Sequence, residues 1–176
     1  WGNMIAGSDW RSTFFHDGAA GYTNNLFVEH LYGINAYHEY MAWFRASFSD
    51  DQEKTILAPP PDLSVTSKAF YARKTPYDIL KGPLVLHTLR YLVGDDAFFT
   101  LLRSMTYPQP PTMKDIETCR YCRTASVEDF FLLAEQVTGK ELDWFFEFYF
   151  YRPELPKLIS VDKGDSLQIA WQVPAG

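Results

Sequence analysis

The amino-acid sequence predicts a mainly α-helical protein, an antiparallel array of helices followed by a short β-hairpin at the C-terminus. Through most of the 176 residues, apolar side chains recur every three or four positions, the spacing of a helix with one buried face. Glycine and proline interrupt this pattern at intervals that suit helices joined by connections. After Pro156 the pattern changes to two short β-prone runs around a turn.

Two helices are predicted in the first third of the chain. The first covers Thr13–Leu31 and is followed by Gly33, a suitable C-cap. The second extends from about Asn35 to Phe48 with aromatic residues along one side. Three prolines, Pro59–Pro61, end any helix because proline lacks the amide proton, so residues 55–75 are predicted to be a long connection.

The next two helices are separated by Gly94. One begins near Pro76, which suits the first turn of a helix, and continues to Val93. Asp95 is predicted to cap the helix that follows. Six or so helices are expected in all.

The C-terminal part of the sequence contains a loop, two helices and the hairpin. Tyr107–Ala125 holds both cysteines and several prolines and is predicted to be a loop or an insertion. Ser126-x-x-Asp129 has the form of a capping box, and Gly139 ends the helix that it begins. A further helix covers Leu142 to about Tyr151. The hairpin turn is Asp162-Lys163-Gly164-Asp165, between the runs 158–161 and 167–171.

Composition and charge exclude several classes of protein. The net charge is -6 and no run of clustered lysine and arginine occurs, so nucleic acid is not an expected partner. No stretch of eighteen uncharged apolar residues is present, so no membrane span is expected and the protein should be soluble. The sequence shows no N-terminal targeting region, and the compartment stays open. The aromatic content of 17% is high, and helix packing is its commonest cause.

The two cysteines, Cys119 and Cys122, form one Cys-x-x-Cys pair. A structural zinc site needs four ligands, and the four histidines are not spaced to supply the other two nearby. Structural or incidental thiols are the favoured interpretation. A redox motif is the alternative, although no strand is predicted before the pair, as it would be in a thioredoxin-like site.

Several short motifs occur in a fixed order along the chain. They are Trp1-Gly2-Asn3, the run 14–22 around His16-Asp17-Gly18, Lys81-Gly82, Gly94-Asp95-Asp96-Ala97-Phe98-Phe99, Gly139-Lys140-Glu141-Leu142-Asp143-Trp144-Phe145-Phe146 and Tyr151-Arg152-Pro153-Glu154-Leu155-Pro156. In this order they resemble the M1-family (gluzincin) zinc aminopeptidases. The resemblance implies the C-terminal part of the catalytic domain, a thermolysin-like helical subdomain that starts just after the His-Glu-x-x-His helix. Residues 1–156 would belong to this part, and residues 157–176 would begin a following β domain.

The resemblance also assigns metal-binding residues. Asp17 occupies the position of the family's third zinc ligand, a glutamate, and its side chain is one methylene shorter. His16 replaces the family's asparagine beside that ligand and is a second candidate metal ligand. Without the resemblance, an aspartate near a helix start is a capping or dipole residue, and a neighbouring histidine is solvated or a capping partner.

The catalytic tyrosine of the family lies two residues before the Lys-Gly pair, where it hydrogen-bonds the oxyanion of the tetrahedral intermediate. Such a donor contributes a factor of roughly a hundred or more. Ile79 stands at that position here and has no donor. Tyr77 is the substitute candidate for the catalytic role, and the alternative is an ordinary half-buried tyrosine.

These assignments imply a fragment of a zinc metallopeptidase, an aminopeptidase that releases N-terminal residues from peptides. The two histidine ligands and the glutamate base would lie on the preceding helix, so we expect this chain alone to bind no zinc and to be inactive. Its parent's partner would be a peptide substrate, and the apolar face that the preceding helix covers would be open to self-association. The alternative is a non-catalytic, degenerate helical domain of this type that binds peptides or protein partners.

Overall fold

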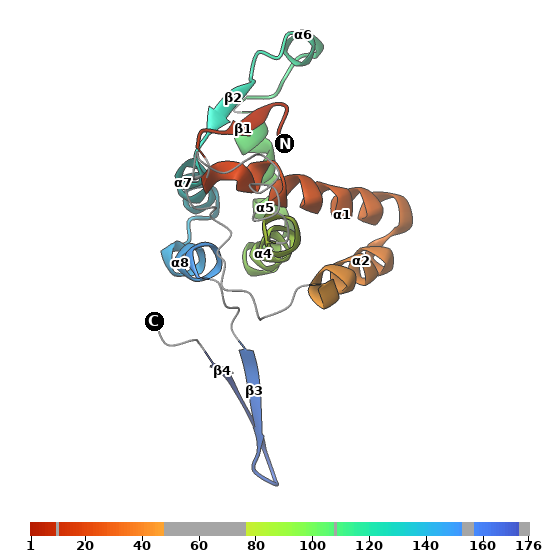
Figure 1. Cartoon of the computed structure of the whole chain (residues 1–176), viewed down its shortest axis with the longest axis vertical. Helices are drawn as coiled ribbons and strands as arrows, with labels where there is room; N and C mark the ends of the chain where they lie inside the picture. Colours follow the sequence, from red (N-terminus) through yellow and green to blue (C-terminus); the bar gives the residue numbers. More distant parts are fainter. Residues whose placement is uncertain (10, 48–76, 108, 153–156, 173–176) are drawn as a thin grey trace, which may run out of the picture.

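The computed structural model describes residues 1–9, 11–47, 77–107, 109–152 and 157–172, and this part of the chain is mainly helical. The predicted fold class is therefore confirmed. Figure 1 shows most of the helices gathered in one body, with the C-terminal β-hairpin apart from it. The predicted connection at residues 55–75 lies outside the described residues.

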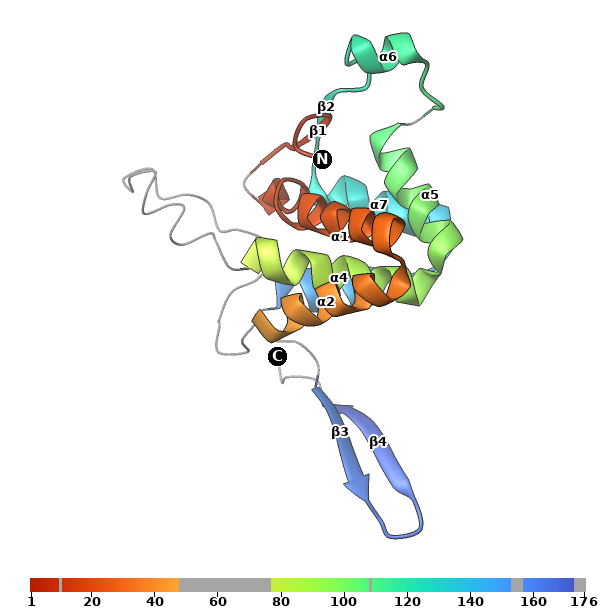
Figure 2. The ribbon, with the colours of Figure 1, turned by 90° about the vertical axis from the view of Figure 1, so that its right-hand side faces the viewer.

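Three helices form one side of the body. A short 3-10 helix, η1 (Arg11–Phe15), precedes α1 (Gly18–Tyr32), and α2 (Ile34–Ser47) and α4 (Tyr77–Val93) pack against α1 (Figure 2). The predicted first helix is thus divided before Gly18. Gly33 ends α1 as predicted: its φ is 85°, and its N–H donates to the carbonyl of Glu29.

The other helices in the described part of the chain are α5 (Asp95–Thr106), α6 (Met113–Glu117), α7 (Val127–Thr138) and α8 (Asp143–Tyr151). Both halves of the predicted capping box at the start of α7 form, since Ser126 accepts from the N–H of Asp129 and the Asp129 carboxylate accepts from the N–H of Ser126. Gly139 ends α7 in the left-handed region with φ 64°, as predicted.

Two local predictions were wrong. Gly94, not Asp95, occupies the N-cap position of α5, and the Asp95 side chain binds Arg90 instead. The predicted loop 107–125 contains α6 and a strand, β2 (Arg123–Ala125). The signal for α6 was present, because Thr112 and Asp115 make a capping box like that of α7.

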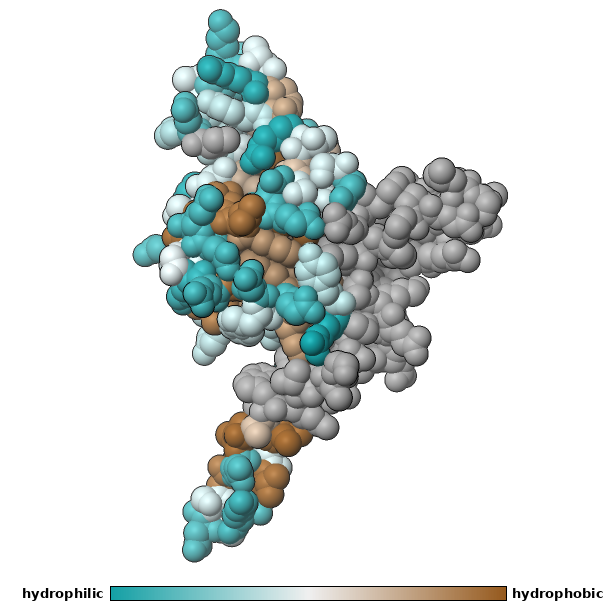
Figure 3. Space-filling model, turned by 90° about the vertical axis from the view of Figure 1, so that its left-hand side faces the viewer, coloured by the Kyte–Doolittle hydropathy of each residue, from teal (hydrophilic) through white to brown (hydrophobic). Residues whose placement is uncertain are grey.

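The strands among the described residues form two separate ribbons. β1 (Ile5–Gly7) pairs in parallel with β2, with Ile5 opposite Arg123. β3 (Lys157–Asp162) and β4 (Leu167–Gln172) form the predicted antiparallel hairpin. Apolar side chains are exposed along this hairpin (Figure 3): Ile159, Val161, Leu167 and Ile169.

Aromatic rings fill the core and explain the high aromatic content. Phe14 meets Phe150 edge to face with ring centroids 4.9 Å apart, and Phe131 stacks on Phe146 at 3.9 Å. Phe130 contacts Phe14 as well, so η1, α7 and α8 share one aromatic cluster. Among the described residues, no helix combines the length and apolarity needed to cross a membrane.

Candidate functional site

The candidate site lies where α1 and α4 cross at two glycines. A Cβ built on Gly82 would lie 2.5 Å from the Cα of Gly18, closer than any real contact of this kind. A Cβ on Gly18 would lie 2.8 Å from the Phe14 ring and 3.1 Å from the Cα of Gly82. The two helices can approach this closely only because neither glycine has a side chain. We call this contact the glycine crossing.

The glycine crossing brings two predicted motifs together. Asp17 immediately precedes Gly18, and Lys81 immediately precedes Gly82, so the Asp-Gly and Lys-Gly pairs meet at their glycines although they are far apart in the sequence. Lys81 is fully buried, and its ammonium group donates to the carbonyl oxygen of Arg152 at 2.5 Å. This bond ties α4 to the end of α8 and gives the buried ammonium group a hydrogen-bond partner.

Asp17 occupies the N-cap position of α1 and is half-buried. Its carbonyl accepts the N–H of Gly21 at 2.9 Å, but its side chain makes no capping hydrogen bond. The interpretation of Asp17 as a side-chain cap is therefore not what the structure shows. Asp17 nevertheless lies at the N-terminus of α1, where the helix dipole is positive.

His16 is exposed and faces the first residues of the chain. The N–H of Gly7 donates to its Nε2 over 3.4 Å, and a Cβ on Gly2 would lie 3.2 Å from its Nδ1. Both ring nitrogens thus lie near the backbone of residues 2–7. A metal bound through Nε2 would displace the contact with Gly7, since that lone pair accepts its N–H.

Tyr77 is the first residue of α4, and Ile79 follows within the same turn. A helix rises 1.5 Å per residue, so the backbone of Tyr77 lies about 7.5 Å along the axis from that of Gly82. Tyr77 therefore begins the segment that runs toward the glycine crossing. Its side chain, like that of Ile79, lies outside the described part of the structure.

The described residues do not by themselves fit a catalytic zinc ion. A hydrolytic zinc site needs three protein ligands. Nowhere in the described ranges do three His, Cys, Asp or Glu side chains come together in a way that could hold a metal. Asp17 and His16 are the donors near the glycine crossing that the sequence predicted, and they would leave such a site incomplete.

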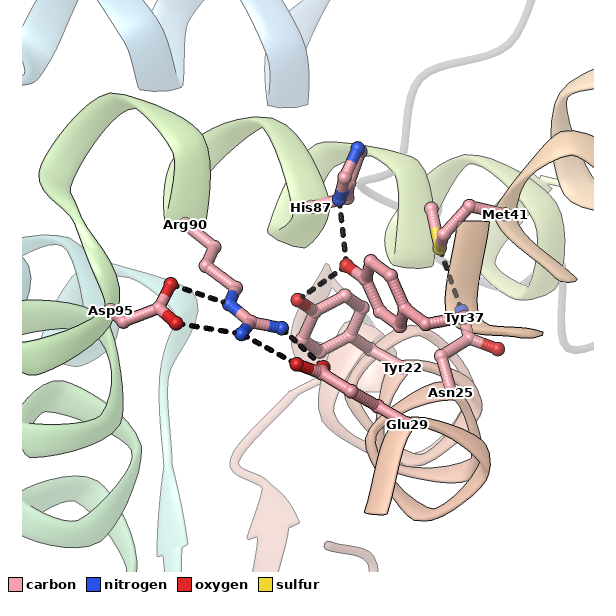
Figure 4. A network of polar contacts seen from close by, with 8 residues as sticks. All are labelled: Tyr22, Asn25, Glu29, Tyr37, Met41, His87, Arg90 and Asp95. Atoms are coloured by element: carbon pink, nitrogen blue, oxygen red, sulfur yellow. Dashed lines mark hydrogen bonds and ion pairs between the residues drawn. The ribbon is translucent and has the colours of Figure 1, made fainter. Parts of the chain in front are cut away.

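A second polar cluster, which the sequence did not predict, joins α1, α4 and α5 through Arg90 (Figure 4). Its guanidinium donates to the carboxylate of Glu29 at 2.6 and 3.0 Å and to that of Asp95 at 2.8 and 2.9 Å. The cation also lies 4.9 Å from the ring centre of Phe99. Hydrogen bonds from Arg90 lower the pKa of Asp95, and those to Asp95 and Glu29 raise the pKa of Arg90 itself. These paired charges indicate a structural role.

Two tyrosines and a histidine extend this cluster across α1, α2 and α4. The hydroxyls of Tyr22 and Tyr37 lie 2.9 Å apart, and that of Tyr37 lies 2.6 Å from Nδ1 of His87. Burial raises the pKa of Tyr22. Burial lowers the pKa of His87, and the nearby His38 and Arg90 lower it further, so the His87 ring is favoured in its neutral form.

No local signal in the sequence could have identified this cluster. Glu29 and Arg90 are 61 positions apart, and each tyrosine occupies an ordinary apolar position of its helix. Partners this distant become neighbours only through the packing of α1 on α4.

Comparisons with protein-family models, with curated proteins and with solved structures find no match to this chain. The motifs and the glycine crossing are therefore the basis for assigning a function to this chain.

Proposed function

We propose that this chain is the C-terminal part of the catalytic domain of an M1-like zinc metallopeptidase, an aminopeptidase that releases N-terminal residues from peptides. The observation that supports it best is the glycine crossing, because it sets Asp17-Gly18 against Lys81-Gly82. These are the two motifs that the resemblance assigns to the zinc ligand and to the segment carrying the oxyanion donor.

In this proposal Asp17 supplies one carboxylate ligand from the start of α1. When bound, the zinc ion would lower the pKa of a water molecule and so supply the nucleophile. The two histidines and the glutamate base would come from a segment before Trp1. Lys81 positions the Asp-Gly turn by holding α4 against Arg152, and it has no place in the chemistry itself.

The proposed domain division also has support in the hairpin. Residues 1–156 would form the helical part, and residues 157–176 would begin a β domain. The hairpin exposes Ile159 and Val161 as well as Leu167 and Ile169, and a two-stranded ribbon with exposed apolar residues is marginal alone. Further strands packed on it would remove this apolar surface from water.

One substitution favours a second candidate, a non-catalytic helical domain that binds peptides or protein partners. Ile79 stands where the family has its oxyanion donor, and isoleucine cannot donate a hydrogen bond. In this case Tyr77 has no catalytic role.

The test uses the protein as encoded, including any residues before Trp1. Zinc content and release of a chromophore from amino-acid anilides are measured for the wild type, for Asp17→Ala and for the control Asp96→Ala on an exposed site of α5. We expect Asp17→Ala to lose both zinc and activity and Asp96→Ala to keep both.

Each other outcome has a definite meaning. Zinc binding without hydrolysis would support the non-catalytic domain. Zinc content and activity that do not depend on Asp17 would refute the ligand assignment. The chain 1–176 alone should bind no stoichiometric zinc and release no chromophore, and chelator-sensitive activity in it would contradict the proposal.

A further inference from the structure

Cys119 and Cys122 lie in the turn between α6 and β2. These two elements form an arm that projects from the rest of the helices (Figure 1). Cys119 and Cys122 are joined by a disulfide, with their Cα atoms 5.2 Å apart. The N–H of Cys122 also donates to the carbonyl of Cys119 at 2.9 Å. The disulfide therefore directly constrains the backbone of this one turn.

The backbone at this turn is held in an unfavourable conformation. Cys119 has φ 52°, in the left-handed region, where its Cβ crowds the backbone. Among the described residues it is the one non-glycine with positive φ. Opening the disulfide removes a covalent restraint on this conformation.

The pair is also open to solvent. Cys119 is exposed and Cys122 is half-buried. Exchange between a disulfide and an external thiol requires that the attacking thiolate reach a sulfur atom, which buried structural disulfides prevent. An incoming thiolate can approach from the Cys119 side.

The turn leads directly into the contact between β1 and β2. Arg123 follows Cys122, and its N–H donates to the carbonyl of Met4 at 2.9 Å while its guanidinium donates to that of Met105 at 2.7 Å. Two residues on, the carbonyl of Ala125 accepts the N–H of Ser8 at 2.9 Å. A conformational change in the turn would therefore alter the backbone hydrogen bonds of residues 4–8.

From these observations we infer that Cys119 and Cys122 form a reversible thiol–disulfide exchange site whose oxidation state controls the stability of the β1–β2 pairing. The reductant is a dithiol. One of its thiolates attacks Cys119 Sγ, which forms a mixed disulfide and releases Cys122 as a thiolate that takes a proton from water. The second thiol then displaces Cys119, and two electrons have passed from the dithiol, now a cyclic disulfide, to the cysteine pair.

This inference does not depend on zinc or on peptidase activity. The oxidised chain 1–176 is equilibrated without denaturant in mixtures of reduced and oxidised dithiothreitol, and thiols are trapped by alkylation and counted by mass spectrometry. Hydrogen exchange is measured on the same samples. We expect the pair to be reduced in the folded protein and residues 4–8 and 123–125 to exchange about tenfold faster, while α4 exchanges as before.

The double variant Cys119→Ser/Cys122→Ser provides the control. It should show the faster exchange with and without dithiothreitol, because it has no disulfide to lose. If this variant does not fold, the wild-type measurements decide alone. Resistance to reduction until denaturant is added would overturn the inference, and so would reduction that leaves the exchange of residues 4–8 unchanged.

Discussion

Replacing Gly82 by alanine tests the glycine crossing directly. In an ordinary helix this change stabilises the protein by about 1 kcal/mol, because glycine loses more backbone freedom on folding. Here the added methyl would lie 2.5 Å from the Cα of Gly18, whereas ordinary contacts begin at 3.4 Å. The obstacle is backbone, which cannot rotate away as a flexible side chain can, so α1 and α4 must separate by about 1 Å.

The expected effect follows from two opposed terms. Overpacking a tight contact costs about 1–3 kcal/mol, and the upper end applies because two backbones meet. After the gain in helix propensity, we expect Gly82→Ala to lower the free energy of unfolding by about 2 kcal/mol. For a chain of this size the melting temperature should fall by about 4–8 °C.

Urea denaturation followed by circular dichroism measures this change. Gly139→Ala is the matched control, because Gly139 has φ 64° and a Cβ there would meet nothing within 4 Å. That variant should lose roughly 1 kcal/mol from left-handed backbone strain alone. If Gly82→Ala is as stable as the wild type, or more stable, the helices do not cross as described and the argument for the site fails.

Four further changes test the polar contacts. Arg90→Met should lower the free energy of unfolding by about 2–4 kcal/mol, measured in urea, because it leaves the Glu29 carboxylate partly buried without its cation. Ser126→Ala should cost about 1 kcal/mol in the same assay through loss of the helix cap. Asn25→Leu should be neutral or stabilising, since the buried Oδ1 of Asn25 has no hydrogen-bond partner in the described structure and Nδ2 donates to the sulfur of Met41. Burial lowers the pKa of His87 in the folded protein. The contribution of His87 to stability should therefore be complete above about pH 6.5 and decline as the pH falls toward the folded-state pKa. In urea titrations between pH 7 and 5, the free energy of unfolding of a His87→Gln variant should decline less than that of the wild type.

The sequence predicted those features that depend on neighbours within one turn. The capping box of Ser126 and Asp129, the left-handed Gly139 and the hairpin all follow from residues two to four positions apart. In each case both hydrogen-bonding groups, or the residue type that the backbone conformation requires, lie within the same short segment. Such predictions need no knowledge of how the helices pack.

The same local reasoning failed where a distant residue offered a stronger interaction. Asp95 has the side chain of a helix cap, but a paired guanidinium outweighs one backbone N–H as a partner for a carboxylate. Likewise β1 and β2 are too short to signal strands, and they form because the chain brings Ile5 beside Arg123. These outcomes are decided by packing between segments.

The candidate site depends both on short sequence motifs and on packing between distant segments. The Asp17-Gly18 and Lys81-Gly82 pairs were predicted by resemblance, but only the packed helices show that the two glycines touch. A glycine at either position alone could serve a turn or a helix end. Where two such glycines touch across two helices, their contact fixes the positions in the fold of the charged residues that precede them. Gly82→Ala and Asp17→Ala should therefore have different effects. The first should disturb the glycine crossing and the site together, whereas the second should leave the glycine crossing in place and remove the proposed metal ligand.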